Sequence, residues 1–165
     1  MISLKILELN RFMAGLLKSD AFDALWLREG YVRTFMEYRF QGRLYPEFYD
    51  TKEAEALQGR SCALWGEVRP VVLELVKGRR TPLAFRLDFQ LPEEEVGKVL
   101  ERSDLVLREE QPSLHLQLRF EHGTGRMVTG IARTTFSMDS ALDAAWDAEV
   151  QRRLRELAIA VERES

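Results

Sequence analysis

The sequence predicts an α+β fold: a single antiparallel or mixed sheet of five to six strands, with about four helices packed mainly on one face. Segments in which apolar and polar residues alternate recur along the 165 residues, as in strands with one buried side. Between them lie segments with apolar residues three or four positions apart, as in amphipathic helices. The expected order is β-α-β-β-α-β-α-β-β-α, in a single domain over residues 1–165.

The first 44 residues predict a strand, a helix and two further strands. Apolar residues alternate over residues 2–6, and an apolar helical stripe follows over residues 9–17, with Asn10 near its start as a cap. Residues 22–44 are rich in aromatic and β-branched side chains, which favours strands. We expect the two strands to be divided by a turn or bulge near Glu29-Gly30.

The middle of the chain predicts a helix from Thr51 to Lys77, ended by Gly78. Gly59 and Pro70 disturb its pattern. Because a proline inside a helix costs about 3 kcal/mol, we expect either a kink or a second helix that begins at Pro70.

Residues 82–91 and 114–120 show the clearest alternation, so each is expected to bury one face and expose the other. The first of these strands should bury Leu83, Phe85, Leu87, Phe89 and Leu91. Pro92 and three glutamates then begin a short helix. The glycine-containing turn at 122–125 predicts a hairpin whose return strand covers residues 127–136.

The C-terminal segment predicts one long helix. Asp139 is the expected cap, and an apolar stripe continues to Val161. Glu149 and Arg153 are four positions apart and should form an ion pair. Residues 162–165 are expected to be a solvated terminus.

Composition narrows the classes of function. The net charge of −3, from 24 basic and 27 acidic residues, excludes a bulk polycation but not a local basic patch. The single cysteine, Cys62, allows no intrachain disulfide. There is no signal-peptide core and no run near the ~18 apolar residues of a membrane span. We therefore expect a cytoplasmic protein with no membrane partner.

No residue pattern indicates catalysis, a cofactor or a metal. His115 and His122 are seven positions apart, an odd separation that places them on opposite faces of a strand. Cys62 is expected to be a buried, inert thiol. The acidic groups at 93–95 and at 139 and 143 are explained by helix N-termini. We therefore predict no catalytic residue, no cofactor and no metal site.

Basic residues form the one constellation that suggests binding. Several should share the solvent-facing side of the sheet or its edge, where arginine can bind phosphate and Tyr31 or Tyr38 can stack on bases. A solvated face balanced by acidic neighbours such as Asp88 is the alternative, and the acidic net charge favours it. The candidate patch consists of Arg33, Arg39, Arg43, Arg69, Lys77, Arg79, Arg80, Arg86 and Arg119.

Residues 22–49, 64–91 and 136–154 resemble an uncharacterised family of small proteins from clostridia-type bacteria, a domain of unknown function. The most specific phrase of the resemblance comprises Trp65, Arg69, Pro70, Lys77, Gly78, Thr81, Pro82, Leu83 and Phe85. The resemblance implies a stand-alone cytoplasmic protein and supplies no activity or site. Arg69 and Lys77 are the two residues of the phrase that packing does not obviously require.

Three functions are therefore expected, in this order. The first is a non-enzymatic binding or interaction module that uses the exposed sheet face, with a homodimer as one form. The second is a phosphate or nucleic-acid binder built on the candidate patch. The third is an enzyme without a recognisable motif.

Overall fold

The computed structural model describes residues 1–106, 110–133 and 140–165. The α+β class is confirmed, but the predicted numbers are wrong: the described chain forms an antiparallel sheet of eight strands with five α-helices, not five to six strands with about four. The strands are β1 (Ser3–Ile6), β2 (Trp26–Arg33), β3 (Glu37–Gln41), β4 (Ala63–Leu64), β5 (Ala84–Gln90), β6 (Ser113–Glu121), β7 (Thr124–Ala132) and β8 (Val161–Glu164). The helices are α1 (Leu9–Lys18), α2 (Thr51–Ala56), α3 (Trp65–Val76), α4 (Glu93–Arg102) and α5 (Ala141–Glu156), with a 3-10 turn η1 (Pro46–Phe48).

The strand order is β3-β2-β5-β6-β7-β1-β8, and β4 pairs with the start of β2. The hairpin between β6 and β7 is confirmed. His122 and Gly123 have φ of 52° and 75°, and two successive positive φ values are typical of a two-residue type I′ turn. Most neighbours in this order come from distant parts of the sequence, and long-range pairing therefore assembles most of the sheet.

The unpredicted elements lie in two segments. The sequence predicted one helix from Thr51 to Lys77 and a solvated terminus at residues 162–165. The predicted helix from Thr51 to Lys77 is two helices, because the chain leaves the helical path at Gln58 and Gly59, where φ is positive. Pro70 lies inside α3 instead of beginning it. The predicted last helix ends at Glu156, and the terminus then pairs with β1 as strand β8.

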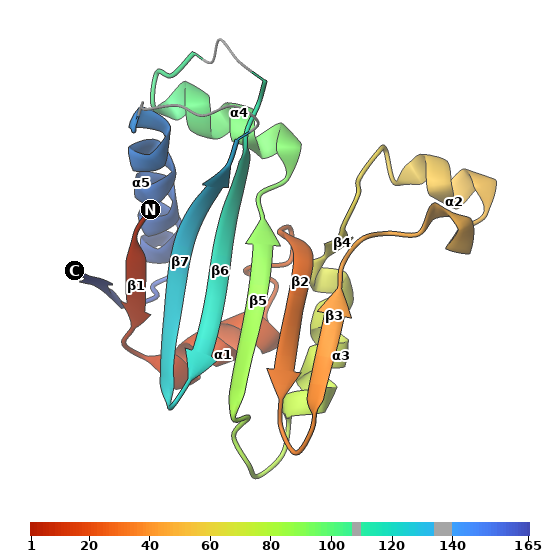
Figure 1. Ribbon diagram of the computed structural model, residues 1–165, viewed down its shortest axis with the longest axis vertical. Coiled ribbons are helices and arrows are strands. Elements are labelled where there is room, and N and C mark those ends of the chain that lie inside the picture. The colour runs from red at the N-terminus through yellow and green to blue at the C-terminus, as the bar shows by residue number, and fades with distance from the viewer. Residues whose placement is uncertain (107–109, 134–139) are drawn as a thin grey trace.

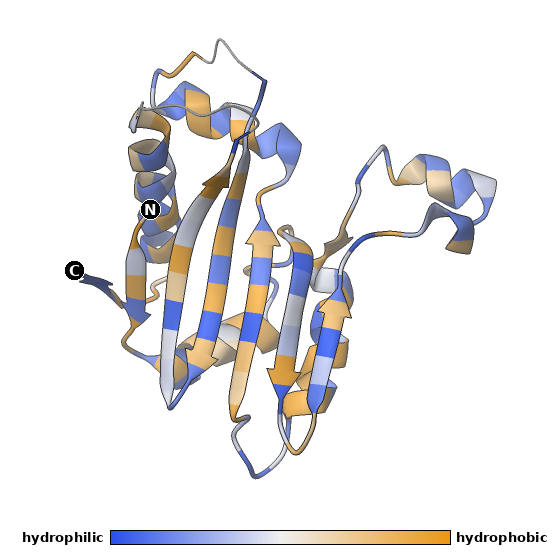
Figure 2. Ribbon diagram, in the orientation of Figure 1, coloured by the Kyte–Doolittle hydropathy of each residue, from blue (hydrophilic) through white to orange (hydrophobic). Residues whose placement is uncertain are grey.

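Four helices, α1, α3, α4 and α5, bury their apolar residues against one side of the sheet, which we call the dry face. Figure 1 looks onto the opposite side, with α1 and α3 behind the strands. Figure 2 shows the alternating hydropathy of β5 and β6 that produces the two faces. The dry face and the helices share Leu27, Val32, Phe85, Leu87, Phe89, Leu116, Leu118 and Met127, which are all buried.

Smaller expectations were also corrected. Leu83 is 65% exposed and precedes β5, because the strand begins at Ala84. Asn10 is not a cap, since α1 begins after Glu8. The predicted turn or bulge near Glu29-Gly30 is a register shift inside β2, between Leu27 and Glu29, and the turn to β3 lies further on, at residues 34–36. The predicted strand residues 134–136 and the predicted cap Asp139 lie outside the described residues.

Within the three described ranges, no helix has both the length and the apolar character that a membrane crossing requires.

Candidate functional site

The side of the sheet opposite the helices is the candidate binding surface, and we call it the wet face. Residues paired across neighbouring strands project on the same side of a sheet. The register pairs Tyr31 with Arg39 and with Arg86, and then Arg86 with Arg119. It continues from Arg119 to Arg126 and Lys5. A cation row therefore crosses six strands of the wet face: Arg39, Tyr31, Arg86, Arg119, Arg126 and Lys5.

Four of the nine predicted patch residues lie in the row or beside it. Arg39, Arg86 and Arg119 are members, and Arg33 lies one row away on the same face of β2. The guanidinium carbons of Arg33 and Arg39 lie 5.4 and 5.8 Å from the centre of the Tyr31 ring. Both guanidinium groups are therefore within the range of a cation–π contact with Tyr31.

Two members of the row, Arg126 and Lys5, were missed by sequence reasoning. Each is a polar position of an alternating strand, so parity alone could have placed it on the wet face. The sequence does not show that β1 pairs with β7, and this pairing places Arg126 and Lys5 in line with Arg119.

The other five predicted residues lie elsewhere. Arg69 donates to both carboxylate oxygens of Asp23 at 2.8 Å, so it joins α3 to the loop between α1 and β2. Lys77 forms an exposed pair with Glu74. Arg43 lies over the ring of Tyr45 at 4.8 Å, beyond the end of β3. Arg79 and Arg80 are exposed in the turn between α3 and β5.

Carboxylates neutralise most of the wet face. Glu37 binds both Arg33 and Arg39, and the hydrogen bond from Arg33 lowers the pKa of Glu37. Asp88 accepts from Arg86, and Glu164 accepts from Arg126 at 3.0 Å. Arg119 is different: within the described part of the chain its side chain makes no ion pair or hydrogen bond. Arg119 lies between Arg86 and Arg126, and like charges directly opposite one another destabilise a sheet. Its guanidinium is therefore chemically suited to bind an anionic group.

Beside the cation row the wet face is hollowed by about 500 Å³, over strands β2, β5, β6 and β7. Arg28, Asp88, Gln117 and Arg119 are among its lining residues. His115 also lines it, and burial together with nearby Arg28 lowers the pKa of His115, which keeps the imidazole neutral near pH 7. A hollow of this kind gives a partner side chain a place to insert.

His115 is also the nearest approach to a catalytic group. Its Nε2 lies 2.7 Å from the Ser113 hydroxyl oxygen, two residues away on the same strand face. A serine nucleophile needs a base that a third group orients. Within the described residues, no carboxylate is hydrogen-bonded to the His115 ring. The pair is therefore better explained as a polar contact on the sheet surface.

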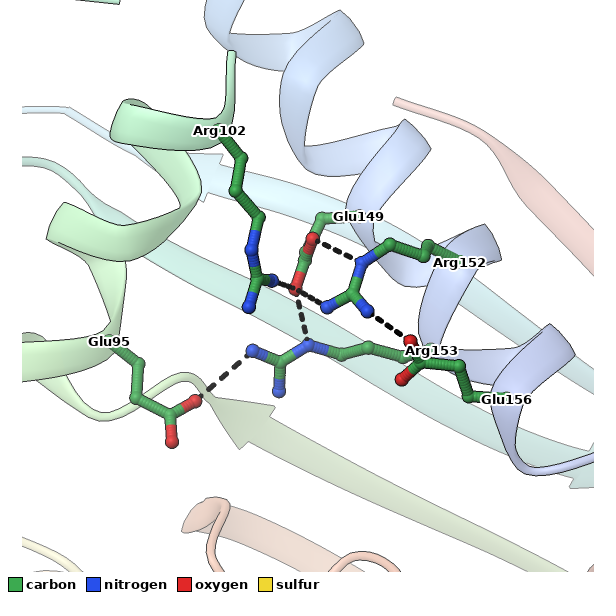
Figure 3. Close-up of polar contacts among 6 residues, drawn as sticks. All are labelled: Glu95, Arg102, Glu149, Arg152, Arg153 and Glu156. Carbon is green, nitrogen blue, oxygen red and sulfur yellow. Dashed lines mark hydrogen bonds and ion pairs between the residues drawn. The ribbon is translucent and has the colours of Figure 1, made fainter. Parts of the chain in front are cut away.

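A second charged cluster lies on the helical side, and it stabilises the fold (Figure 3). Glu149 of α5 is 5% exposed and accepts hydrogen bonds from Arg102, Arg152 and Arg153 at 2.7–2.8 Å. Arg153 also reaches Glu95 of α4 at 3.1 Å. Burial raises the pKa of Glu149, but the three guanidinium groups outweigh burial and lower it to about 2.

The sequence predicted the Glu149–Arg153 pair, which is confirmed at 2.8 Å. It did not predict that Arg102 of α4 would join the pair, because that contact depends on how two helices pack. A mostly apolar pocket of about 250 Å³ adjoins this cluster between α5, Pro92 and the loop before β2. The cluster is balanced, with three cations and three carboxylates (Figure 3), so it leaves no net charge to attract a ligand.

Within the described residues, no three His, Cys, Asp or Glu side chains gather in a way that could hold a metal ion. Cys62 is buried as predicted, but it precedes α3 in an extended segment and does not lie on a helical face.

Comparison with known proteins gives one family. A family model described as a family of unknown function (DUF5721) matches residues 15–162. No curated protein and no solved structure matches the chain. The match confirms the resemblance to a domain of unknown function and carries no information on the source organism.

Proposed function

The chain belongs to this family of unknown function, and from its geometry we propose that it is a non-enzymatic interaction module whose contact surface is the wet face. One observation carries the proposal. The four core helices all pack on the dry face, so strands β2, β5, β6, β7 and β1 present a broad surface that no described element covers (Figure 1). A cytoplasmic location in a clostridia-type bacterium stays a prediction.

Size and chemistry both support a protein partner. Five strand-to-strand steps from β3 to β1, at about 4.8 Å each, make the face roughly 24 Å wide, and the longest strands run about 30 Å. This footprint approaches the ~800 Å² per partner of a standard interface. The face also mixes paired charges, an aromatic ring at Tyr31 and a hollow, which is the composition of a non-obligate interface.

Site-specific photo-crosslinking in the organism of origin tests the proposal. A crosslinking phenylalanine analogue replaces Val128, which lines the hollow on β7. The matched control replaces Val71, which is 54% exposed on α3 at the helical side. We expect one adduct of defined mass from position 128 and none from position 71. Equal adducts from both positions, or none from position 128, would refute the proposal.

The cation row gives a second candidate function, a phosphate or nucleic-acid binder. An anionic polymer lying across the strands would meet Arg86, Arg119, Arg126 and Lys5 in succession. Phosphate contacts release counterions, so binding of a fluorescent oligothymidine should weaken steeply as salt rises. The double substitution Arg119→Ala, Lys5→Ala in the row should weaken it too, whereas Arg79→Ala with Arg80→Ala, in the turn between α3 and β5, should not. The carboxylates beside the row argue against this function, and an oligothymidine that does not bind even at low salt excludes it.

A further inference from the structure

Residues 43–62 form an arm that leaves the body between β3 and β4 (Figure 1). The two ends of the arm are hydrogen-bonded to each other where the arm leaves the sheet. Leu44 N donates to Ser61 O at 2.8 Å, and Ala63 N donates to Gly42 O at 2.8 Å. Arg43 and Cys62 form a bridge between these two bonds. The base of the arm is therefore fixed in direction, and Figure 1 shows α2 carried away from the rest of the molecule.

The arm buries almost nothing in its own chain. From residue 43 to residue 61 no residue is buried, although this stretch includes Phe48, which is 86% exposed, and Tyr45, which is 50% exposed. Helix α2 has only six residues, and so short a helix is not stable by itself in water. A capping box between Asp50 and Glu53 closes its first turn, and just before it Phe48 contacts Tyr49 edge to face. An ordered arm that exposes aromatic rings is a preformed binding element.

The charge of the arm identifies what it fits. Residues 45–58 of the arm hold four carboxylates and one lysine, a net charge of −3, and Arg43 and Arg60 at its base bring the whole arm to −1. On the wet face most cations are paired with carboxylates, but Arg119, in the middle of the cation row, has no carboxylate partner among the described residues. Lys5, at the end of the row, forms no ion pair within the described residues. The hollow beside Arg119 is open to an aromatic side chain.

The proposed function gives the wet face a partner, and on that basis we propose that the partner is a second copy of this chain, whose arm docks on the cation row. Figure 1 shows the arm extending sideways past β3, beside its own wet face and not over it. Every copy has both an acidic arm and a basic row. A two-fold exchange of arms therefore satisfies both surfaces at once and closes the assembly as a dimer.

Sedimentation velocity of the purified full-length chain at low salt, over a range of concentrations, tests the exchange. Wild type is expected to shift from monomer to dimer as concentration rises. Phe48→Ala should weaken dimerisation about tenfold or more. The matched control is Phe35→Ala, because Phe35 is 89% exposed in the β2–β3 turn, outside the arm, and this variant should dimerise as wild type does.

A charge exchange makes the test specific. One variant reverses the arm with Glu47→Lys and Glu55→Lys, and the other reverses the row with Arg119→Glu and Lys5→Glu. These four side chains make no ion pair within the described residues, so the fold should tolerate their replacement. Each variant alone should be monomeric because its arm and its face have the same sign. Their equimolar mixture should recover a dimer.

Three results would overturn the inference: a monomer at every concentration, a dimer unaffected by Phe48→Ala, or a mixture that stays monomeric. The proposed function is judged separately. A crosslinked adduct from position 128 with a protein of another mass would leave the wet face as the binding surface and remove the second copy. Loss of face-specific crosslinking would remove both.

Discussion

Replacing Glu149 by glutamine is expected to destabilise the protein by about 2–3 kcal/mol at pH 7. The carboxylate is 5% exposed and is held by three guanidinium groups, which lower its pKa from 4.5 to about 2. Converted at about 1.4 kcal/mol per pH unit, this difference is about 3 kcal/mol. Solvent reduces it somewhat, because Arg102 is 51% exposed and Arg152 and Arg153 about a third exposed.

The pH dependence gives the same effect a second signature. The pKa of Glu149 is lower in the folded protein than in the unfolded chain, so its stabilisation is fully present above about pH 5. It is lost progressively as pH falls from about 4.5 toward 2, where the folded carboxylate takes up a proton. The Glu149→Gln variant has no such carboxylate, so its unfolding free energy should depend less on pH across this range.

Urea denaturation followed by tryptophan fluorescence measures both effects, since Trp146 lies on α5 near Glu149. Glu156→Gln is the matched control. Glu156 is 62% exposed and contacts Arg152 alone among the ion pairs of the described residues, so its loss should cost less than about 0.5 kcal/mol. If Glu149→Gln unfolds within 0.5 kcal/mol of wild type and follows the same pH dependence, the buried carboxylate does not stabilise the packing of α4 on α5.

Three further substitutions test the backbone and the core in the same urea assay. Gly42→Ala should destabilise by about 3 kcal/mol or more, since its Cβ would lie 1.8 Å from Leu27 O, and wild-type stability would contradict the close approach. Gly97→Ala in α4 meets no atom within 4 Å and should stabilise by about 0.5–1 kcal/mol; a loss of stability would show an unseen clash. Thr129→Val should lower the free energy of unfolding by about 1–3 kcal/mol, because the buried backbone N–H of Ile2 loses the hydroxyl that accepts its hydrogen bond at 2.9 Å. An unchanged free energy of unfolding would mean that a water molecule accepts this hydrogen bond instead.

Local patterns predicted the elements that span several residues with one period. The alternation over residues 82–91 and 114–120 identified β5 and β6 and placed Arg86 and Arg119 on the wet face, as observed. It failed at Leu83, because the pattern does not show where a strand begins. Strand β4 has two residues and β8 has four, and neither is long enough to display a period.

The candidate site was predictable only in part for a related reason. Parity along a strand states which face a residue occupies, but not which strand lies beside it. The predicted patch accordingly mixed Arg86 and Arg119, which share the wet face, with Arg69, whose guanidinium binds Asp23 on the helical side. For the arm the sequence predicted only a helix that begins at Thr51, since the exposure of Phe48 is a property of its surroundings.

By itself the sequence determined the α+β class, the two faces of the central strands, the hairpin at His122-Gly123 and the Glu149–Arg153 pair. All of these depend on residues close together in the chain, where the geometry of a strand, a turn or a helix determines which residues contact one another. The tertiary structure alone decided the strand order, and with it the cation row, the contact of Arg102 with Glu149 and the isolation of the arm. Those contacts join segments far apart in sequence, and their partners are chosen by the packing of the whole core.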